Sequence, residues 1–308
     1  MLIKMWKTAI PLLLSVLIMT ACASTVKVQV ERTPNLDTSG LRRIAIMPFT
    51  ASSGRSIYNK MAQFITATAR NRIAALNHFT LVEPSTIPQG NENTGQYVDA
   101  LFSGQVTNVN ERVSKIKRQV TDKETGVIRN IFTFRREVKI EFYYYITRIS
   151  DGGIIGPVYC KGSNFAYDDS RGGLTSSTNL LRAIVNGQLR YLGRDIAPYT
   201  VTEDRKLIKE PSKDKELKAL MKNAQSELRV GSYEAALESY LGIYARYRNF
   251  AAALNASILH EALGQTREAA ALMQAEFAKT GNPRAWNELE RLNKILEDRA
   301  MIEKMYNN

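Results

Sequence analysis

Two segments near the C-terminal end of the chain repeat one pattern at a fixed distance. Gly231 and Gly264 are 33 residues apart, and so are Ala236 and Ala269. In each segment the glycine favours a tight turn, and the small alanine lets two helices approach closely beside a large side chain four residues later. A period of this length is typical of stacked helix–turn–helix units. It predicts an all-α domain of helical hairpins over residues 212–308.

These segments resemble tetratricopeptide repeats, with Pro283 starting a last helix that would cap the stack. The resemblance implies a groove that binds envelope proteins. Carried over by position, its lining residues would be Lys218, Met221, Gln225, Arg229, Leu254, Ile258 and Glu261. The alternative is that these residues only complete a small helical bundle. Because two repeats are few, we expect the domain to pack on the first domain or on a partner.

The N-terminal end has the pattern of an export signal. Lys4 and Lys7 precede a mainly apolar stretch, residues 9–18, which is too short to cross a hydrocarbon core about 30 Å thick. The stretch ends in Met-Thr-Ala-Cys and resembles the signal of bacterial lipoproteins. That resemblance implies removal of residues 1–21, lipidation of Cys22 and, because no aspartate follows, an outer-membrane anchor facing the periplasm. The alternative is a cleaved secretory signal with a chance cysteine.

The region after the cysteine is expected to begin as a tether. Residues 22–39 are mostly polar and contain Pro34, so they predict a lipidated tether before a first domain over residues 40–205. The first elements of that domain are a strand over 43–49, a helix over 56–76 and a strand over 79–83. This order and spacing predict a βαβ unit.

Long strands dominate the middle of the first domain. We expect strands over 100–108, at about 111–121 and at about 128–149, a returning strand over 154–166 and a helix over 177–197. The second strand alternates strictly, and its predicted core residues are Val138, Ile140, Phe142, Tyr144 and Ile146. Such alternation indicates an antiparallel strand with one buried face. The fold class is therefore α+β, followed by the helical domain.

Five strings in this domain resemble the curli-secretion lipoprotein family (CsgG-like). They are residues 44–49, 78–84, 103–106, 147–153 and 183–185. The domain is equally similar to the outer-membrane lipoproteins that activate peptidoglycan synthases (LpoB-like). The resemblance implies an α/β sandwich without enzyme activity.

Some members of that family form secretion channels as homo-oligomers, and this is the alternative function. A strand that faces lipid needs about 9–11 residues with apolar outward side chains. Here both faces of 111–121 carry cations, at Arg112, Lys115, Lys117 and Arg118. Each would cost roughly 2–4 kcal/mol at the middle of a bilayer. The pattern therefore does not favour a pore made by these strands.

The positive charge of the chain is concentrated in the first domain. The chain has 42 basic and 30 acidic residues, and residues 23–200 carry 23 and 14 of them, a net charge of +9. The export signal argues against nucleic acid as the partner. Anionic phospholipid, lipopolysaccharide or a cell-wall polymer are the expected counter-charges, although a solvated basic face explains the excess as well.

Residues suited to catalysis or metal binding are scarce. His78 and His260 are the only histidines, and no phosphate loop, zinc-protease motif or nucleophile elbow occurs. Asp168 and Asp169 predict a polar loop rather than a calcium site, and Cys160 predicts a buried thiol. We therefore expect no enzyme activity, no cofactor and no metal. The hypothesis is a lipoprotein scaffold for envelope assembly, in a secretion apparatus or in peptidoglycan synthesis.

Overall fold

The computed structural model describes residues 25–88, 94–121, 123–124, 126–209 and 213–307. The predicted signal peptide, residues 1–21, and the predicted lipidation site, Cys22, lie outside the described residues. The chain divides into two compact units. The α/β unit comprises residues 33–199 and 305–307, and the helical unit comprises residues 25–32 and 200–304. The predicted α+β class with a helical C-terminal region is confirmed.

The α/β unit begins with the predicted βαβ arrangement. Strands β2 (Arg43–Ile46) and β4 (Thr80–Val82) pair in parallel, and helix α2 (Ser56–Ala74) connects them. Strand β3 (Thr50–Ala51) pairs with β5 (Ala100–Thr121), and short 3-10 turns occupy Pro84–Thr86 and Thr94–Gln96. With β6 (Ile128–Arg148) and β7 (Ile154–Asp168), the six-stranded sheet has the order β4-β2-β5-β6-β7, and β3 lies off this path.

Three long antiparallel strands form the rest of the sheet: β5 (Ala100–Thr121), β6 (Ile128–Arg148) and β7 (Ile154–Asp168). The alternating residues predicted for the core of β6 are all buried, with 0–2 % of their surface exposed. One prediction needs correction, because β5 is a single strand across residues 100–121. The sequence predicts a break between two strands in this region. The structure has instead a register shift between Val106 and Asn108, and the strand continues past it.

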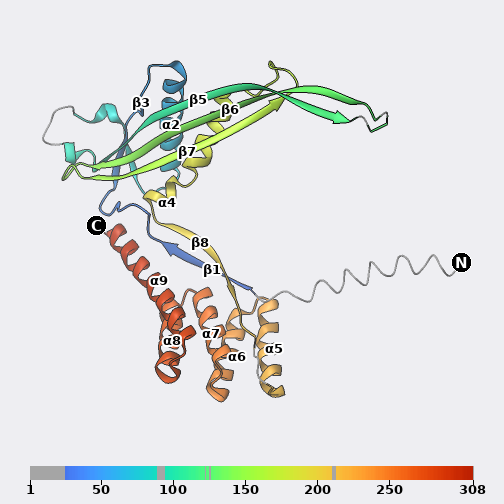
Figure 1. Cartoon of the computed structure of the whole chain (residues 1–308). Helices are drawn as coiled ribbons and strands as arrows, with labels where there is room; N and C mark the ends of the chain where they lie inside the picture. The colour runs from blue at the N-terminus through green and yellow to red at the C-terminus, as the bar shows by residue number, and fades with distance from the viewer. Residues whose placement is uncertain (1–24, 89–93, 122, 125, 210–212, 308) are drawn as a thin grey trace. The chain divides into compact units, whose positions relative to one another are not determined.

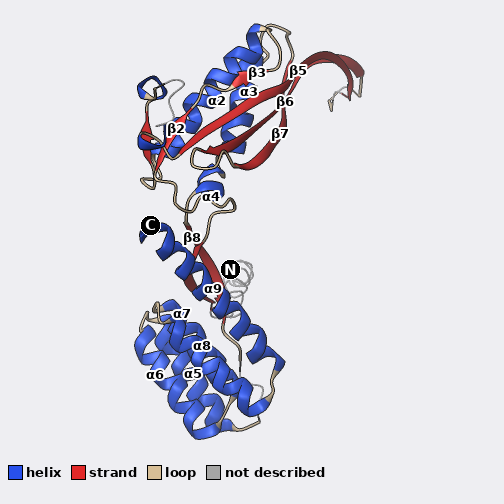
Figure 2. Cartoon of the chain, turned by 90° about the vertical axis from the view of Figure 1, so that its left-hand side faces the viewer, coloured by secondary structure: helices blue, strands red, loops and turns tan. Residues whose placement is uncertain are grey.

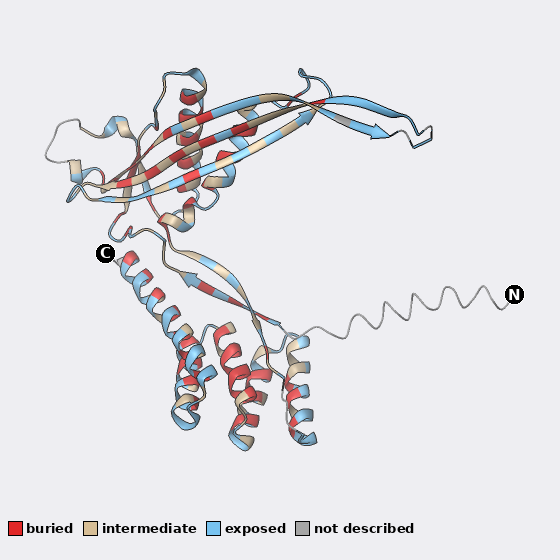
Figure 3. Ribbon diagram, in the orientation of Figure 1, coloured by how far each residue is buried: buried red, intermediate tan, exposed pale blue. Residues whose placement is uncertain are grey.

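Helices pack on the buried face of this sheet. Helix α2 contributes Met61, Ile65, Ala69 and Ile73, which recur every four residues and form one apolar stripe. The helix predicted over 177–197 is two helices, α3 (Ser177–Leu189) and α4 (Leu192–Ile196), whose leucines and isoleucines join the same core. Figure 3 shows buried residues in red along these helices and along the strands of the sheet.

The helical unit contains the predicted hairpins. Its helices are α5 (Lys215–Arg229), α6 (Tyr233–Tyr247), α7 (Phe250–Ala262), α8 (Thr266–Thr280) and α9 (Pro283–Asn307), whose stacked arrangement is visible in Figure 2. Gly231 and Gly264 end the first helix of each hairpin with φ angles of +84° and +79°. These are left-handed values that glycine adopts without strain, which is why both positions of the repeat are glycine.

A tether is predicted over residues 22–39, but residues 25–32 of this range form a strand. Strand β1 (Thr25–Arg32) pairs with β8 (Tyr199–Lys206) in a two-stranded ribbon. Val26, Val28 and Val30 alternate with polar residues and are at most 2 % exposed, in the core of the helical unit. Consequently the α/β unit ends at residue 199 rather than 205.

Within the described residues, no helix has both the length and the apolar character required to span a membrane.

Candidate functional site

Helix α7 lies at the centre of the helical unit and is covered on several sides. Residues 251–259 are all buried, although an outer helix normally leaves one face to solvent. Helices α6 and α8 cover part of α7, and strand β1 and Leu207, just after β8, join the same apolar core. The surface of α7 that would line a groove is therefore occupied by other segments of the same chain.

Asn255 holds one of these segments in place. Its Oδ1 accepts a hydrogen bond from the backbone N–H of Ile208 at 2.9 Å, and its Nδ2 donates one to the carbonyl oxygen of Ile208 at 3.0 Å. Asn255 is 1 % exposed, and Leu207 beside it is 8 % exposed. One side-chain amide thus satisfies both backbone groups of Ile208, as a neighbouring strand would.

The predicted groove residues divide into those that are covered and those that are not. Leu254, Ile258 and Glu261 are 8 %, 2 % and 3 % exposed, so they do not line an open groove. Lys218, Met221 and Gln225 lie together around a cavity of about 140 Å³. Arg229 is exposed at the end of α5 and does not line this cavity. The structure therefore brings together only the three α5 residues that precede Arg229.

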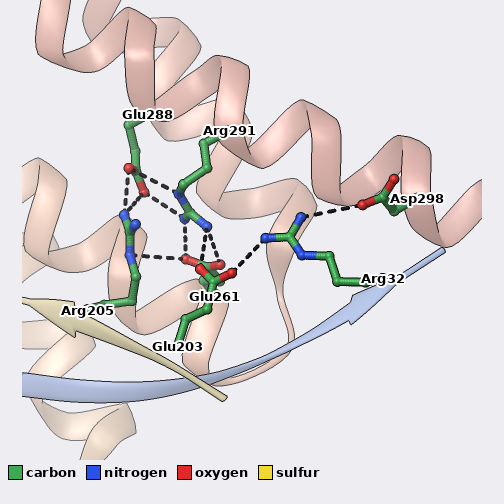
Figure 4. Close-up of polar contacts among 7 residues, drawn as sticks. All are labelled: Arg32, Glu203, Arg205, Glu261, Glu288, Arg291 and Asp298. Carbon is green, nitrogen blue, oxygen red and sulfur yellow. Dashed lines mark hydrogen bonds and ion pairs between the residues drawn. The ribbon is translucent and has the colours of Figure 1, made fainter. Parts of the chain in front are cut away.

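Glu261 belongs to an ionic cluster inside the helical unit (Figure 4). Its Oε1 accepts a hydrogen bond from the Arg291 guanidinium at 2.8 Å, and Arg205 lies 3.8 Å away. The full cluster is Arg32, Glu203, Arg205, Glu261, Glu288, Arg291 and Asp298. It connects the β1–β8 ribbon with α7 and α9. Because Glu261 already has cationic partners, we assign it to this internal cluster and not to a binding surface.

The cluster also shifts the proton equilibria of its members. Burial alone would raise the pKa of Glu288, but hydrogen bonds from Arg291 and the charges of Arg291 and Arg205 lower it below its ordinary value. Burial alone would lower the pKa of Arg291, but its hydrogen bonds to Glu261 and Glu288 raise it. Both groups therefore stay charged around neutral pH.

The cavity on α5 has an apolar floor and a cationic rim. Leu207, Met221 and Tyr240 are buried at its floor, Ile208 and Gln225 are half-buried, and the lysines at its edge are Lys209, Lys218 and Lys222. Among the described residues, none of these three lysines has an ion-pair partner within 4.0 Å. Burial raises the pKa of Tyr240 to about 12, so its hydroxyl stays protonated.

This arrangement suits a short segment that carries a negative charge. Small-molecule pockets usually measure about 300–1,000 Å³, so a cavity of about 140 Å³ has room for one or two side chains. The ammonium groups would attract a carboxylate or phosphate, and the floor would take an apolar group. Sequence reasoning missed Leu207 and Ile208, although an apolar pair between charged residues was a visible signal.

The other candidate residues lie elsewhere. His260 Nδ1 is 2.7 Å from Gln265 Oε1, and His78 is half-buried at the turn before β4. Cys160 is buried as predicted, and Asp168 Oδ1 accepts hydrogen bonds from the backbone and hydroxyl of Ser170 in a loop. In the part of the chain that the structure describes, no group of three or more His, Cys, Asp or Glu side chains is placed to hold a metal ion.

Comparisons with known proteins add little to this description. No family model matches the chain, and no curated protein matches it in sequence. Lipoprotein GNA1162 from Neisseria meningitidis is 11 % identical with a TM-score of 0.26, over 49 % of this chain and 98 % of that one. Rare lipoprotein B from Shewanella oneidensis is 13 % identical with a TM-score of 0.23, over 50 % and 91 %. A minor lipoprotein from Acinetobacter baumannii is 10 % identical with a TM-score of 0.25, over 51 % and 90 %. Scores of this size assign no function to the chain.

Proposed function

We propose that this chain is a non-enzymatic lipoprotein, anchored in the outer membrane through Cys22 and facing the periplasm. In this proposal the helical unit holds a partner protein during assembly of the cell envelope. The partner belongs to a secretion apparatus or to the peptidoglycan-synthesis machinery, and it presents an extended segment that carries a carboxylate.

One observation carries the partner-binding proposal. Asn255 holds the backbone of Ile208 beside a cavity that has an apolar floor and a rim of lysines. The unit thus already holds an extended segment through its backbone, and the cavity lies directly along that segment. A peptide that continues this path would place its side chains between Met221 and Tyr240 on the floor.

The charge of the rim specifies the chemistry of the partner. Lys209, Lys218 and Lys222 bring three positive charges to one small cavity. An ammonium group attracts a carboxylate, and the attraction strengthens where an apolar floor keeps water away. An acidic segment with one apolar side chain is therefore the best match.

The capture test compares two double variants of the full-length chain, each extracted from membranes in mild detergent. K218Q/K222Q removes two rim charges. The control K279Q/K304Q removes two exposed lysines of α8 and α9 that line no cavity named here. A solubilised envelope fraction is passed over each variant. An exposed ion pair contributes about 0.2–1 kcal/mol, so the loss of two should weaken binding by about twofold to thirtyfold, and K218Q/K222Q should capture correspondingly less of the partner. Equal capture by both variants would refute the cavity as the binding site.

The location test concerns Cys22. Replacing it with serine removes the thiol that the lipid would occupy, so the C22S chain should leave the membrane fraction. Unchanged membrane partitioning of C22S would refute lipid anchoring. This result is independent of the capture test.

A further inference from the structure

Strands β5 and β6 continue beyond the rest of the sheet as a two-stranded arm, which projects from the α/β unit in Figure 1. Strand β7 ends at Asp168, opposite Phe134 of β6. Beyond that point the pairing of β5 and β6 runs from Lys115↔Phe134 to Thr121↔Ile128. We define the arm as residues 115–121 and 128–134. Two-stranded ribbons are marginally stable in water, so a long one that stands free of the sheet suggests a binding surface.

The arm exposes a group of large apolar side chains. Ile128 is 63 % exposed, Phe132 46 %, Val120 42 % and Ile131 41 %. Residues on a strand alternate between its faces and paired residues share a face, so Ile128 and Phe132 lie on one face. Ile131 lies on the other face, together with the Val120–Arg129 pair. Each face of the arm therefore exposes two of these four apolar side chains. Contiguous exposed apolar groups mark interaction sites in soluble units.

Cations lie among these apolar groups. Lys117 pairs in register with Phe132, and Arg129 pairs with Val120. The Nζ of Lys115 lies 4.1 Å from the centre of the Phe132 ring. Among the described residues, Lys117 and Arg129 have no ion-pair partner within 4.0 Å.

The adjoining part of the sheet is different. There Arg136 pairs with Glu111 at 2.9 Å, Arg135 with Glu137 at 3.2 Å and Lys161 with Glu141 at 2.8 Å. These three cations of the sheet body are thus paired with carboxylates of the same sheet. Lys117 and Arg129 of the arm are therefore available to bind an external anion.

We propose that the arm binds an anionic lipid surface. Its lysines and arginine would contact phosphate headgroups, while Ile128, Phe132 and their apolar neighbours enter the boundary between headgroups and acyl chains. The cations paired with Phe132 and Val120 limit the depth to the interface, roughly 5–10 Å. Juxtaposed basic and apolar side chains bind anionic membranes by adding electrostatic attraction to apolar burial.

The charge of the unit favours lipid over a second copy of the chain. Residues 23–200 carry a net charge of +9, so two such units repel each other when their arms approach. A lipid surface offers both the negative charge and the apolar layer that the arm presents. This contact goes beyond the proposed function, because it uses neither the α5 cavity nor Cys22.

The test places a tryptophan on the arm of the full-length chain. F132W is bound to vesicles of phosphatidylglycerol with brominated acyl chains, which quench indole groups that reach the interface. The control F165W carries tryptophan at an equally exposed site on β7, where Phe165 is 53 % exposed. The signal of the native Trp286 is subtracted by measuring the parent chain. We expect quenching and a blue shift for F132W alone, and no quenching on brominated phosphatidylcholine.

Two charge variants in the F132W background complete the test. K117Q/R129Q removes two arm cations and should abolish the quenching. K60Q/R171Q removes one exposed lysine and one exposed arginine elsewhere in the unit and should leave it unchanged. Equal quenching of F132W and F165W, or of F132W on both lipids, would overturn the proposal. Self-association in the absence of lipid would also overturn the proposal if I128S/F132S abolished it and the similarly exposed control I154S/F165S did not. The arm would then bind a second copy of the chain.

Discussion

The side chain of Asn255 forms hydrogen bonds with both backbone groups of Ile208, at 2.9 and 3.0 Å. This contact joins α7 to a segment 47 residues earlier in the chain. It explains why α7 is buried on the side that would otherwise line a groove. It also sets the position of the α5 cavity, because Ile208 forms part of its wall.

Removing this amide should free the segment that it holds. N255A leaves the backbone N–H and the carbonyl of the half-buried Ile208 without these partners, so we expect a loss of about 1–3 kcal/mol in the free energy of unfolding. Hydrogen exchange at the Ile208 amide should accelerate strongly. The control N293A removes an exposed asparagine of α9 and should change stability by less than about 0.5 kcal/mol. Unchanged protection of the Ile208 amide in N255A would contradict the contact.

The ionic cluster should make stability depend on pH in the acid range. The pKa of Glu288 is lower in the folded chain than its ordinary value of 4.5. Its stabilising effect is therefore complete above that ordinary value and is lost as pH falls through the folded pKa. E288Q should cost about 3 kcal/mol at pH 7, because it leaves Arg205 and Arg291 partly unpaired, and this difference should shrink in acid. Denaturant unfolding of E288Q, with the exposed E290Q as control, measures it. A difference that grows as pH falls would contradict the assignment.

The thiol of Cys160 should be unreactive in the folded chain. Burial, aided by the charge of Asp195, raises its pKa to about 12, so almost no thiolate exists at pH 8. A thiol reagent should therefore modify Cys160 only after unfolding. Because a lipidated Cys22 has no free thiol, membrane-extracted protein should release one reactive thiol per chain in denaturant. Two would show that Cys22 is unmodified.

Gly104 should tolerate no larger residue. A Cβ at this position would collide with the ring of Phe49 and with the carbonyl oxygen of Tyr143. Because backbone atoms must move, we expect G104A to lower the free energy of unfolding by about 1–3 kcal/mol. A Cβ added to Gly187, inside α3, would have no atom within 4 Å. G187A should instead raise stability by about 0.5–1 kcal/mol, and thermal unfolding of both variants checks the pair. Equal stability of G104A and G187A would contradict the close contacts described at Gly104.

Local patterns predicted the elements well because each depends on its own residues. The alternation from Val138 to Ile146 identified the buried face of β6, and the spacing of Gly231 and Gly264 identified the hairpins. Strand β1 was missed although Val26, Val28 and Val30 alternate with polar residues. Its partner β8 begins at Tyr199, and no pattern near β1 in the sequence predicts pairing with a strand so far along the chain.

The candidate site was only partly predictable for a related reason. Position within a helical repeat grouped Lys218, Met221 and Gln225, and these three residues line one cavity. It could not show that Leu254 and Ile258 are covered, because the covering segments come from β1 and from the residues after β8. The available signal was that residues 251–259 are small or apolar on nearly all sides of α7, a pattern that position within a repeat does not take into account.

Photo-crosslinking at the α5 cavity identifies the segment that binds there. A benzophenone side chain replaces Lys218 in the full-length chain, and a second chain carries it at Ala271, an exposed site on α8. After irradiation in intact cells, we predict a crosslinked partner for residue 218 only, joined through a segment that contains Asp or Glu beside an apolar residue. The yield should fall when K222Q is added. The same adducts from both sites, or a crosslinked segment without acidic residues, would contradict the account.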